Sequence, residues 1–377
     1  MTESMDQRIR HIPLTNPILD TEMVDAAVHA MKSERFVLGE SVFKFEEEFA
    51  RFCGTKYGIS TASGTAALIL SLLAIDVSQS EVITSTASFV ASANSIIHAG
   101  ATPRFADANL EDYTIDPAGV ASAITKKTKA VVPVHLYGYP AAMDQLRSVA
   151  SDNNLAIVED ACQAHGATID GRKAGSIGTV GCFSFYPTKN MTVAGDGGMI
   201  VTNDKSIAET VTSLRDCGRA EGIRYRHTRF GFTERLNTVQ AAIGRVQLRK
   251  LEVWNQKRTS IAKLYDSLLS NIGEVKTPPK GNNRINPVYH LYVIRASERD
   301  KLREWLRSRG IEGAIHYPDP IHLQPIYRET FGYKEGKFPN SEKLCKEVLS
   351  LPIFPTMTDS DVEYVSASIQ EFYKKAD

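Results

Sequence analysis

The segment GCFSFYPTKNMTVAGDGGMIVTN, residues 181–203, decides the fold class. Its two apolar runs, 181–186 and 197–203, flank Lys189 and the glycine-rich stretch AGDGG at 194–198. Runs that are apolar at nearly every position are typical of strands buried on both faces of an α/β sheet. A lysine just beyond such a strand, in a partly desolvated pocket, is usable as an amine nucleophile. Most lysines are solvated surface residues, so the interpretation of Lys189 depends on the rest of the chain.

Upstream of this segment, apolar runs alternate with segments of helical period, which predicts a large α/β domain. The runs lie at 81–85, 102–107, 129–136 and 155–160, and the helical segments include 63–74, 88–99 and 142–153.

After about residue 235 the pattern changes. A long helical stretch from Thr238 to Leu269 precedes a strand-like run at 289–295. Helices are expected near 298–309, 341–350 and 358–374. This order predicts a smaller C-terminal α+β domain. The stretch TPPKGNNRINP at 277–287 has the composition of a surface connection.

The composition disfavours several classes of protein. The 377 residues carry 44 basic and 44 acidic side chains, and this balance speaks against a dedicated nucleic-acid binder. The longest apolar stretch, Ala66 to Ile75, is far shorter than the ~20 residues that span a bilayer. The N-terminal MTESMDQRIRHIPLTNP lacks the continuous apolar region of a signal peptide. We therefore expect a cytoplasmic protein that does not cross a membrane.

Cysteine usage and the usual catalytic signatures narrow the function further. The five cysteines are an odd number, widely spaced and without a C-x-x-C pair, so we expect reduced core thiols and no metal site. The motifs H-E-x-x-H, G-x-x-x-x-G-K-[ST], G-x-G-x-x-G and G-x-S-x-G are missing. Metalloprotease, P-loop, dinucleotide-binding Rossmann and α/β-hydrolase functions are disfavoured.

Two motifs place polar groups at the ends of predicted strands. Ser63-Gly64-Thr65-Ala66 opens an apolar helix, whose free N–H groups suit a bound phosphate; an ordinary capped helix fits the pattern equally well. LAIVEDACQAHGA, 155–167, ends an apolar strand in Glu159 and Asp160, where α/β folds place ligands. One of these carboxylates could hold a heterocyclic nitrogen protonated, although a solvated turn acid is the simpler interpretation.

A third motif, FGFTERLNTVQAAIGRVQL at 230–248, carries the small residues Ala241, Ala242 and Gly244. Small residues permit close helix packing. The pattern fits packing within the chain and packing across a subunit interface equally well.

These features together match one cofactor. A phosphate cradle, an acid for a ring nitrogen, a phosphate-contacting serine at Ser184 and an imine-forming lysine are what pyridoxal phosphate (PLP) requires. The chain also resembles the DegT/DnrJ/EryC1/StrS family of PLP-dependent sugar aminotransferases from about Asn16 to the C-terminus. The resemblance is carried by FEEEFARFCGTKYGISTASGTAALILSLLA, EVITSTASFVASANSI, KAVVPVHLYGYP, VEDACQAHGA, GSIGTVGCFSFYPTKNMTVAGDGGMIVTND, RLNTVQAAIGRVQL and IHYPDPIHLQPIY.

The resemblance implies the type I, aspartate-aminotransferase-like PLP fold. It places a large PLP-binding α/β domain with a mixed, mostly parallel sheet at 1–250 and a smaller α+β domain at 251–377. Lys189 would form the internal aldimine and shuttle a proton between the cofactor C4′ and the substrate carbon. Asp160 would pair with the pyridinium nitrogen, and Gln163 would contact the ring hydroxyl.

The resemblance also implies how the phosphate and the ring are held. Gly64, Thr65 and Ala66 would bind the phosphate through backbone N–H and hydroxyl groups, with Ser184 as a further donor. Phe89 occupies the position of the aromatic ring that stacks on the cofactor.

Two positions depart from the family pattern. Thr233, in GFTERLN, stands where many members carry an asparagine that reaches the phosphate of the neighbouring subunit, and its side chain is shorter. The loop before Phe89 reads TSTAS, at 84–88, in place of a commoner proline-containing version. Lys189 stands where a minority branch of sugar dehydratases has histidine, so transamination is favoured.

The implied function is a transfer in two half-reactions. An amino acid, expected to be L-glutamate, gives its amine to the cofactor, and the resulting pyridoxamine phosphate aminates the keto carbon of a nucleotide-linked deoxysugar. A homodimer with shared active sites is also implied. Two alternatives stay open: an aminotransferase for a cyclitol or another ketone without a nucleotide, and a catalytically idle PLP-fold protein that binds a ligand or partner. Tyr317, His322 and His135 are polar groups near the expected pocket rim, but structural roles are the simpler expectation for the histidines.

Overall fold

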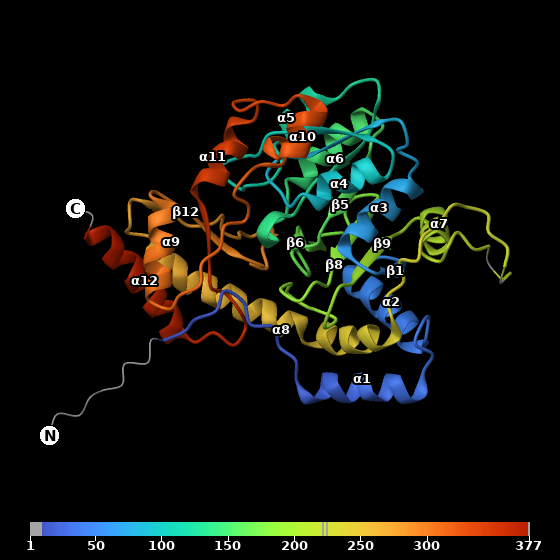
Figure 1. The fold of residues 1–377 in the computed structure, drawn as a ribbon, viewed down its shortest axis with the longest axis horizontal. Helices are drawn as coiled ribbons and strands as arrows, with labels where there is room; N and C mark the ends of the chain where they lie inside the picture. Colours follow the sequence, from blue (N-terminus) through green and yellow to red (C-terminus); the bar gives the residue numbers. More distant parts are fainter. Residues whose placement is uncertain (1–9, 221, 224, 376–377) are drawn as a thin grey trace.

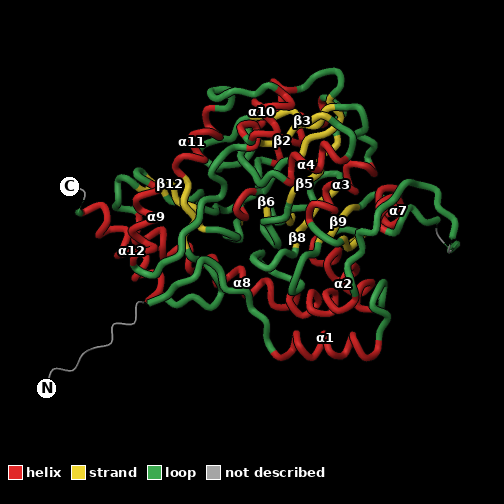
Figure 2. Tube along the Cα trace, viewed as in Figure 1, coloured by secondary structure: helices red, strands yellow, loops and turns green. Residues whose placement is uncertain are grey.

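The computed structural model describes residues 10–220, 222, 223 and 225–375, so the first nine residues of the N-terminal segment lie outside the described part. Its centre is a seven-stranded sheet in the order β1-β9-β8-β5-β4-β2-β3 (Figure 1, Figure 2). The strands are β1 (Tyr57–Thr61), β2 (Glu81–Ser85), β3 (Thr102–Ala106), β4 (Thr128–Val132), β5 (Ala156–Asp160), β8 (Val180–Ser184) and β9 (Gly198–Thr202). Strand β9 is antiparallel to both neighbours, whereas the other pairs are parallel. The predicted mixed, mostly parallel sheet is confirmed.

Helices cover both faces of this sheet because successive strand residues point to opposite sides and both sides are apolar. On β9, Ile200 packs in the core that includes helix α3 (Gly64–Ala74), whereas the next residue, Val201, packs in the core that includes α2 (Glu40–Cys53). The other helices around the sheet are α4 (Ala91–His98), α5 (Pro117–Ala123), α6 (Met143–Asp152) and α7 (Lys205–Arg215).

The long helix α8 (Thr238–Leu269) has the predicted bounds and runs from the large sheet to the C-terminal part of the chain (Figure 1). Its N-terminal half packs on α1 (Thr21–Ser33) and α2, and its C-terminal half packs on α12 (Asp359–Lys374). The predicted division between residues 250 and 251 falls within this continuous helix. Every helix of the described residues is too short or too polar to cross a lipid bilayer.

The C-terminal part is built on an antiparallel sheet in the order β10 (Val275–Lys276), β12 (Tyr292–Ala296) and β13 (Val348–Leu351). Ile12 from the N-terminal segment packs into its core. The predicted helix at 341–350 is wrong at its end, because Val348–Leu351 pairs with β12 as strand β13. Within the expected connection at 277–287, the two residues of β11 pair with β6. The bounds of the remaining elements are β6 (Thr168–Ile169), β7 (Arg172–Lys173), β11 (Ile285–Asn286), α9 (Arg299–Ser308), α10 (Pro325–Phe331) and α11 (Pro339–Glu347), with 3-10 turns at Leu136–Gly138 and Ile321–Leu323.

The small residues of α8 pack at least partly within the chain. Ala241 is fully buried, and a Cβ added at Gly244 would lie 2.8 Å from Phe45 Cζ and 3.1 Å from Val193 Cγ1. The close approach of α2 and α8 at Gly244 therefore requires the absence of a side chain there.

We expect Gly244→Leu to lower the free energy of unfolding by about 1–2 kcal/mol. Leucine gains roughly 0.8 kcal/mol of helix propensity, but the overpacking of a filled core costs about 1–3 kcal/mol or more. Urea unfolding measures the difference. Ser260→Leu, at an exposed position of the same helix, is the control and should stay within about 0.5 kcal/mol of the wild type. Equal stability of the two variants would contradict the packing argument.

Candidate active site

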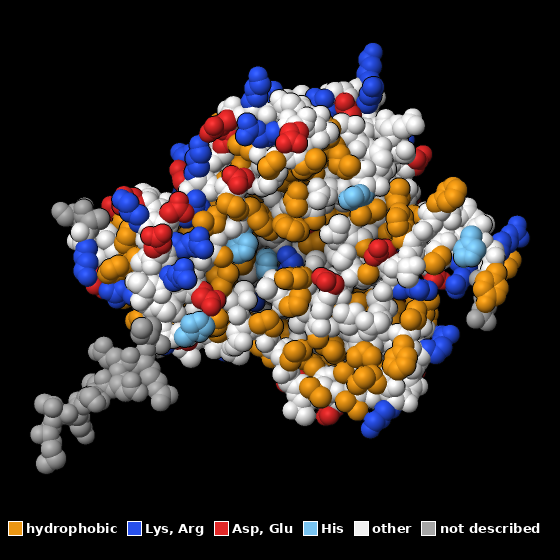
Figure 3. Space-filling view, viewed as in Figure 1, with side chains coloured by type: hydrophobic (Ala, Val, Ile, Leu, Met, Phe, Trp, Pro, Cys, Tyr) orange, Lys and Arg blue, Asp and Glu red, His pale blue; other side chains and the backbone are white. Residues whose placement is uncertain are grey.

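A cavity of about 480 Å³ opens at the carboxyl ends of β5 and β8, and its volume is usual for a small-molecule site. Figure 3 shows a hollow near the centre of the visible face, in which histidine and cationic side chains lie among apolar ones. Most of the predicted site residues line the cavity. These are Gly64, Thr65, Phe89, Asp160, Gln163, Ser184 and Lys189.

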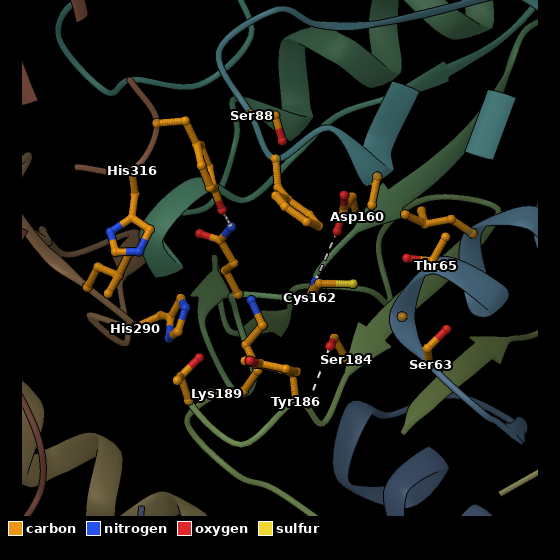
Figure 4. A pocket seen from close by; sticks show the side chains of 18 of the residues that line it. Ser63, Thr65, Ser88, Asp160, Cys162, Ser184, Tyr186, Lys189, His290 and His316 are labelled. Atoms are coloured by element: carbon orange, nitrogen blue, oxygen red, sulfur yellow. Dashed lines mark hydrogen bonds between the residues drawn. The ribbon is translucent and has the colours of Figure 1, made fainter. Parts of the chain in front are cut away.

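Lys189 lies in the loop after β8, where its backbone N–H donates to Tyr186 O at 2.9 Å. Its side chain reaches the cavity (Figure 4) and has no hydrogen-bond or ion-pair partner among the residues that the structure describes. Burial lowers the pKa of Lys189 because desolvation disfavours the ammonium form, while the nearby Cys162 and Asp160 oppose this shift. An unpartnered amine with a lowered pKa is suited to attack a carbonyl carbon.

Asp160 ends β5 and is only 5% exposed. Its Oδ2 accepts a hydrogen bond from Ser92 Oγ at 2.7 Å, and its Oδ1 accepts one from the Cys162 N–H at 3.2 Å (Figure 4). Glu159, the preceding residue on the strand, is completely buried and bonds to His135 at 2.9 Å. Neither acid is the solvated turn residue of the simpler interpretation. Asp160 faces the cavity, and Glu159 lies outside it.

The N-terminus of α3 forms one wall of the cavity. Ser63 caps the helix, since its Oγ accepts from the Ala66 N–H at 3.0 Å. The N–H groups of Gly64 and Thr65 have no acceptor among the described residues. A Cβ at Gly64 would lie 2.6 Å from Ser184 Cβ, so only glycine allows this close contact. Free helix N–H groups beside a hydroxyl make an anion site. The cap occupies the Ala66 N–H, and Ala66 does not line the cavity.

The orientation of Gln163 follows from its neighbours. Its Oε1 accepts from the Tyr137 N–H at 2.7 Å, so the NH₂ group lies on the other side, 3.3 Å from Tyr317 Oη. Tyr137 holds this geometry with a left-handed backbone, at φ 58°. The side chain of Gln163 therefore presents a donor to the cavity, as a contact to a ring hydroxyl requires.

Residues from the C-terminal part complete the cavity and were not among the predicted site residues. His290, Leu291, His316 and Tyr317 line it, and the Tyr317 ring lies 5.7 Å from the half-exposed Phe89 ring. The sequence signals were the strand-like run YHLYVIR and the polar residues of IHYP. Neither signal reveals that both segments contribute to the cavity. Tyr317, which we expected near the pocket rim, lines the cavity.

The two histidines that we expected to be structural lie outside the cavity. His322 is buried and bonds to Thr86 Oγ1 at 2.6 Å and to Glu342 at 3.1 Å. Through Thr86, it holds the TSTAS loop at 84–88. His135 bonds to Glu159, as described above.

Thr233 does not line the cavity of its own chain. It lies at the base of the loop that follows α7, where it pairs with Asp216 and its Oγ1 is 3.5 Å from Cys217 Sγ. The loop itself projects from the body of the molecule (Figure 1). All five cysteines are free. Cys217 is half-buried and Cys162 lines the cavity, so the expectation of core thiols is wrong for these two. Burial raises the pKa of the Cys162 thiol, which makes it a poor nucleophile.

The burial of His165 predicts that the free energy of unfolding depends on pH. Its ring is fully buried between Phe183 and Phe185, and burial lowers its pKa from 6.5 to about 3. Below pH 6.5 the unfolded chain takes up a proton that the native protein accepts only near pH 3. The contribution of neutral His165 to the free energy of unfolding is therefore fully present above about pH 6.5 and is lost progressively as the pH falls from about 6.5 towards 3.

We expect His165→Phe to remove part of this loss. Between pH 7 and pH 5 the wild type should lose about 2 kcal/mol more free energy of unfolding than the variant. Urea unfolding at both pH values measures this difference. His98→Phe, at an exposed position, should leave the pH dependence unchanged, and an equal effect of the two substitutions would refute the assignment to His165.

The mixed seven-stranded sheet, with a lysine, an acid and a helix N-terminus meeting at its strand ends, defines the type I, aspartate-aminotransferase-like fold of PLP enzymes. The chain belongs to the DegT/DnrJ/EryC1/StrS aminotransferase family, whose model matches residues 17–370. The protein is thus an aminotransferase.

Individual relatives cover nearly the whole chain. It is 41% identical over 358 residues to the "Pleiotropic regulatory protein" of Geobacillus stearothermophilus, covering 94% of this chain and 95% of the relative. It is 39% identical over 355 residues to the dTDP-3-amino-3,4,6-trideoxy-alpha-D-glucose transaminase of Streptomyces venezuelae, covering 94% of this chain and 93% of the relative. The crystal structure of S. venezuelae DesV in complex with a ketimine intermediate matches with a TM-score of 0.91 and 38% identity, over 96% of this chain and 98% of that one.

Proposed function

We propose that this protein is a PLP-dependent aminotransferase that moves an amino group from an amino acid to the keto carbon of a nucleotide-linked deoxysugar. The observation that carries the proposal is the meeting of Lys189, Asp160 and the free N–H groups of Gly64 and Thr65 in one cavity. These groups fit a cofactor that has an aldehyde, a basic ring nitrogen and a phosphate. When bound, PLP supplies the electron sink that stabilises a carbanion at the amino-acid carbon.

The residues of the chain supply binding, orientation and proton transfer. Lys189 holds the cofactor covalently and, once released, moves the proton to and from the reacting carbon. Asp160 pairs with the ring nitrogen, and Gln163 donates to the ring hydroxyl. The two substrates exchange an amino group for a carbonyl oxygen: the donor leaves as a 2-oxo acid, and the keto sugar leaves as an amino sugar.

The remaining predicted residues hold the two ends of the cofactor. The backbone of Gly64 and Thr65 and the Ser184 hydroxyl bind the phosphate, and the Phe89 ring covers one face of the pyridine. For the Ala66 N–H to bind the phosphate as well, the phosphate must displace the Ser63 hydroxyl that accepts from it.

The substrates are proposed from the relatives. The S. venezuelae transaminase is named for a dTDP-linked 3-amino sugar, which supports a nucleotide-linked keto sugar as amino acceptor. The amino donor that we propose is L-glutamate, and the proposed location is the cytoplasm.

We also propose a homodimer with shared active sites. Thr233 is exposed and does not line its own cavity. The projecting loop before it carries a fully exposed Phe230, and the adjacent Phe232 is 41% exposed. Apolar side chains displayed on a projecting segment favour burial against another protein surface. In a second copy of this chain, Thr233 would reach the partner's phosphate.

The proposal is tested with the purified protein and PLP. L-glutamate is added, the cofactor spectrum is recorded, 2-oxoglutarate is quantified, and then 3-keto and 4-keto sugars linked to dTDP or UDP are offered beside a cyclitol ketone. Amination of a nucleotide sugar supports the proposal. Amination of the cyclitol ketone alone would show the second kind of aminotransferase. Bound cofactor without any half-reaction would instead indicate a binding or regulatory protein.

A further inference from the structure

Ser92 is a buried hydroxyl that contacts the proposed ring-nitrogen acid from outside the cavity. It is the second residue of α4, is 1% exposed and does not line the cavity. Its Oγ lies 2.7 Å from Asp160 Oδ2 and 3.0 Å from Ser88 Oγ. Ser88 is also buried, but it lines the cavity beside Phe89 (Figure 4).

The direction of these hydrogen bonds follows from the number of protons. An ionised carboxylate only accepts, so Ser92 must donate its single hydroxyl proton to Asp160. Ser88 must then donate to Ser92. The three groups form a one-way chain, Ser88 to Ser92 to Asp160, that ends on the carboxylate.

The chain of hydroxyls restricts the rotation of the Asp160 carboxylate. The terminal torsion of an aspartate is broad and lacks sharp rotamer minima. The Cys162 N–H fixes only one oxygen, at the longer distance of 3.2 Å. The 2.7 Å bond from Ser92 fixes the other. Hydrogen bonds to charged groups are the strong ones in proteins, so Ser92 is the firmer of the two anchors.

The same turn also carries the proposed stacking ring. The Ser92 N–H donates to Phe89 O at 3.2 Å, and the Ser95 hydroxyl donates to Ser92 O at 2.9 Å. The start of α4 thus links the residue that would cover the ring face to the residue that would pair with the ring edge.

We propose that Ser92 is a positioning residue that sets the orientation of Asp160 toward the ring nitrogen of the cofactor. This inference rests on the proposed function, because it requires a cofactor with a basic ring nitrogen at Asp160. Ser92 does not contact the cofactor itself.

The test compares two cofactors in the full-length protein: PLP, and its 1-deaza analogue, in which the ring nitrogen is replaced by CH. Dissociation constants are measured by spectral titration. We expect Ser92→Ala to weaken PLP binding about tenfold, since a hydrogen bond to a charged group is lost. It should change the binding of the analogue less than twofold, because Asp160 has no nitrogen to pair with there.

The control and a second variant make the result decisive. Ser368→Ala removes a buried hydroxyl on α12 that donates to Tyr364 O at 2.8 Å and does not line the cavity, so it should leave both dissociation constants within twofold of the wild type. Ser92→Cys keeps the volume but donates weakly, so it should repeat the PLP-specific loss if the alanine variant folds poorly. Equal losses for both cofactors, or no loss for PLP, would refute the inference. A wild type that binds neither cofactor would instead refute the proposed function.

Discussion

Lys189→Ala is expected to reduce the rate of amino transfer from glutamate by roughly four orders of magnitude. The substitution removes the covalent attachment of the cofactor and also the proton carrier at the reacting carbon, and proton transfer alone contributes about 10²–10⁴-fold. The rate is measured as 2-oxoglutarate formed in a single half-reaction. In parallel, borohydride reduction and peptide mapping should locate the cofactor on Lys189 in the wild type and find no protein-bound cofactor in the variant.

The matched control is Lys173→Ala. Burial lowers the pKa of Lys173 as well, and its ammonium lies 3.4 Å from the centre of the Phe52 ring, but it does not line the cavity. This variant should keep the half-reaction rate within about twofold. A lowered pKa alone would therefore not identify the nucleophile. If the Lys189→Ala protein still traps the cofactor covalently on reduction, the central assignment is wrong.

The parts of the fold that the sequence predicted are those with a local cause. Apolar runs and helical periods depend on neighbouring residues, and the bounds of α8 were predicted to the residue. The end of α11 was missed because the pairing of β13 with β12 depends on a strand more than 50 residues earlier. Helical period alone could not reveal that partner.

The same distinction between local causes and contacts with distant residues applies to the site. The residues that follow β5 and β8 were predictable because strand ends of a parallel sheet meet at one edge. His290 and His316 come from the C-terminal part, so only tertiary folding brings them to the cavity. The strand pattern alone could not separate Glu159 from Asp160, because the two acids are adjacent, and only the family resemblance favoured Asp160. The alternation of side chains along β5 assigns them to different environments.

Glu159 is fully buried, and it ties the strand that carries Asp160 to the segment before β8. Its carboxylate accepts hydrogen bonds from the backbone N–H groups of Gly175 at 2.8 Å, Ile177 at 2.6 Å and Gly178. It also accepts one from His135 Nε2 at 2.9 Å. The Ala141 N–H donates to His135 Nδ1 at 3.0 Å, so in the neutral ring the proton must be on Nε2, facing Glu159.

Glu159→Ala should therefore be among the most destabilising single substitutions in this chain. It leaves three backbone N–H groups and one imidazole N–H buried without an acceptor, and each unsatisfied donor costs about 1–3 kcal/mol. Some relaxation offsets this cost, so we expect a loss of roughly 4 kcal/mol in the free energy of unfolding, measured in urea.

Two comparisons distinguish this effect from the loss of a negative charge. Glu209→Ala, on the exposed side of α7, should change the stability by less than about 0.5 kcal/mol. Glu159→Gln keeps one acceptor oxygen but points a donor at the remaining N–H groups, so its loss should be smaller than that of the alanine variant yet well above that of Glu209→Ala. Because Asp160 follows directly on the same strand, both Glu159 variants should also bind PLP more weakly. A Glu159→Ala protein with wild-type stability would show that these hydrogen bonds do not hold β5 in place.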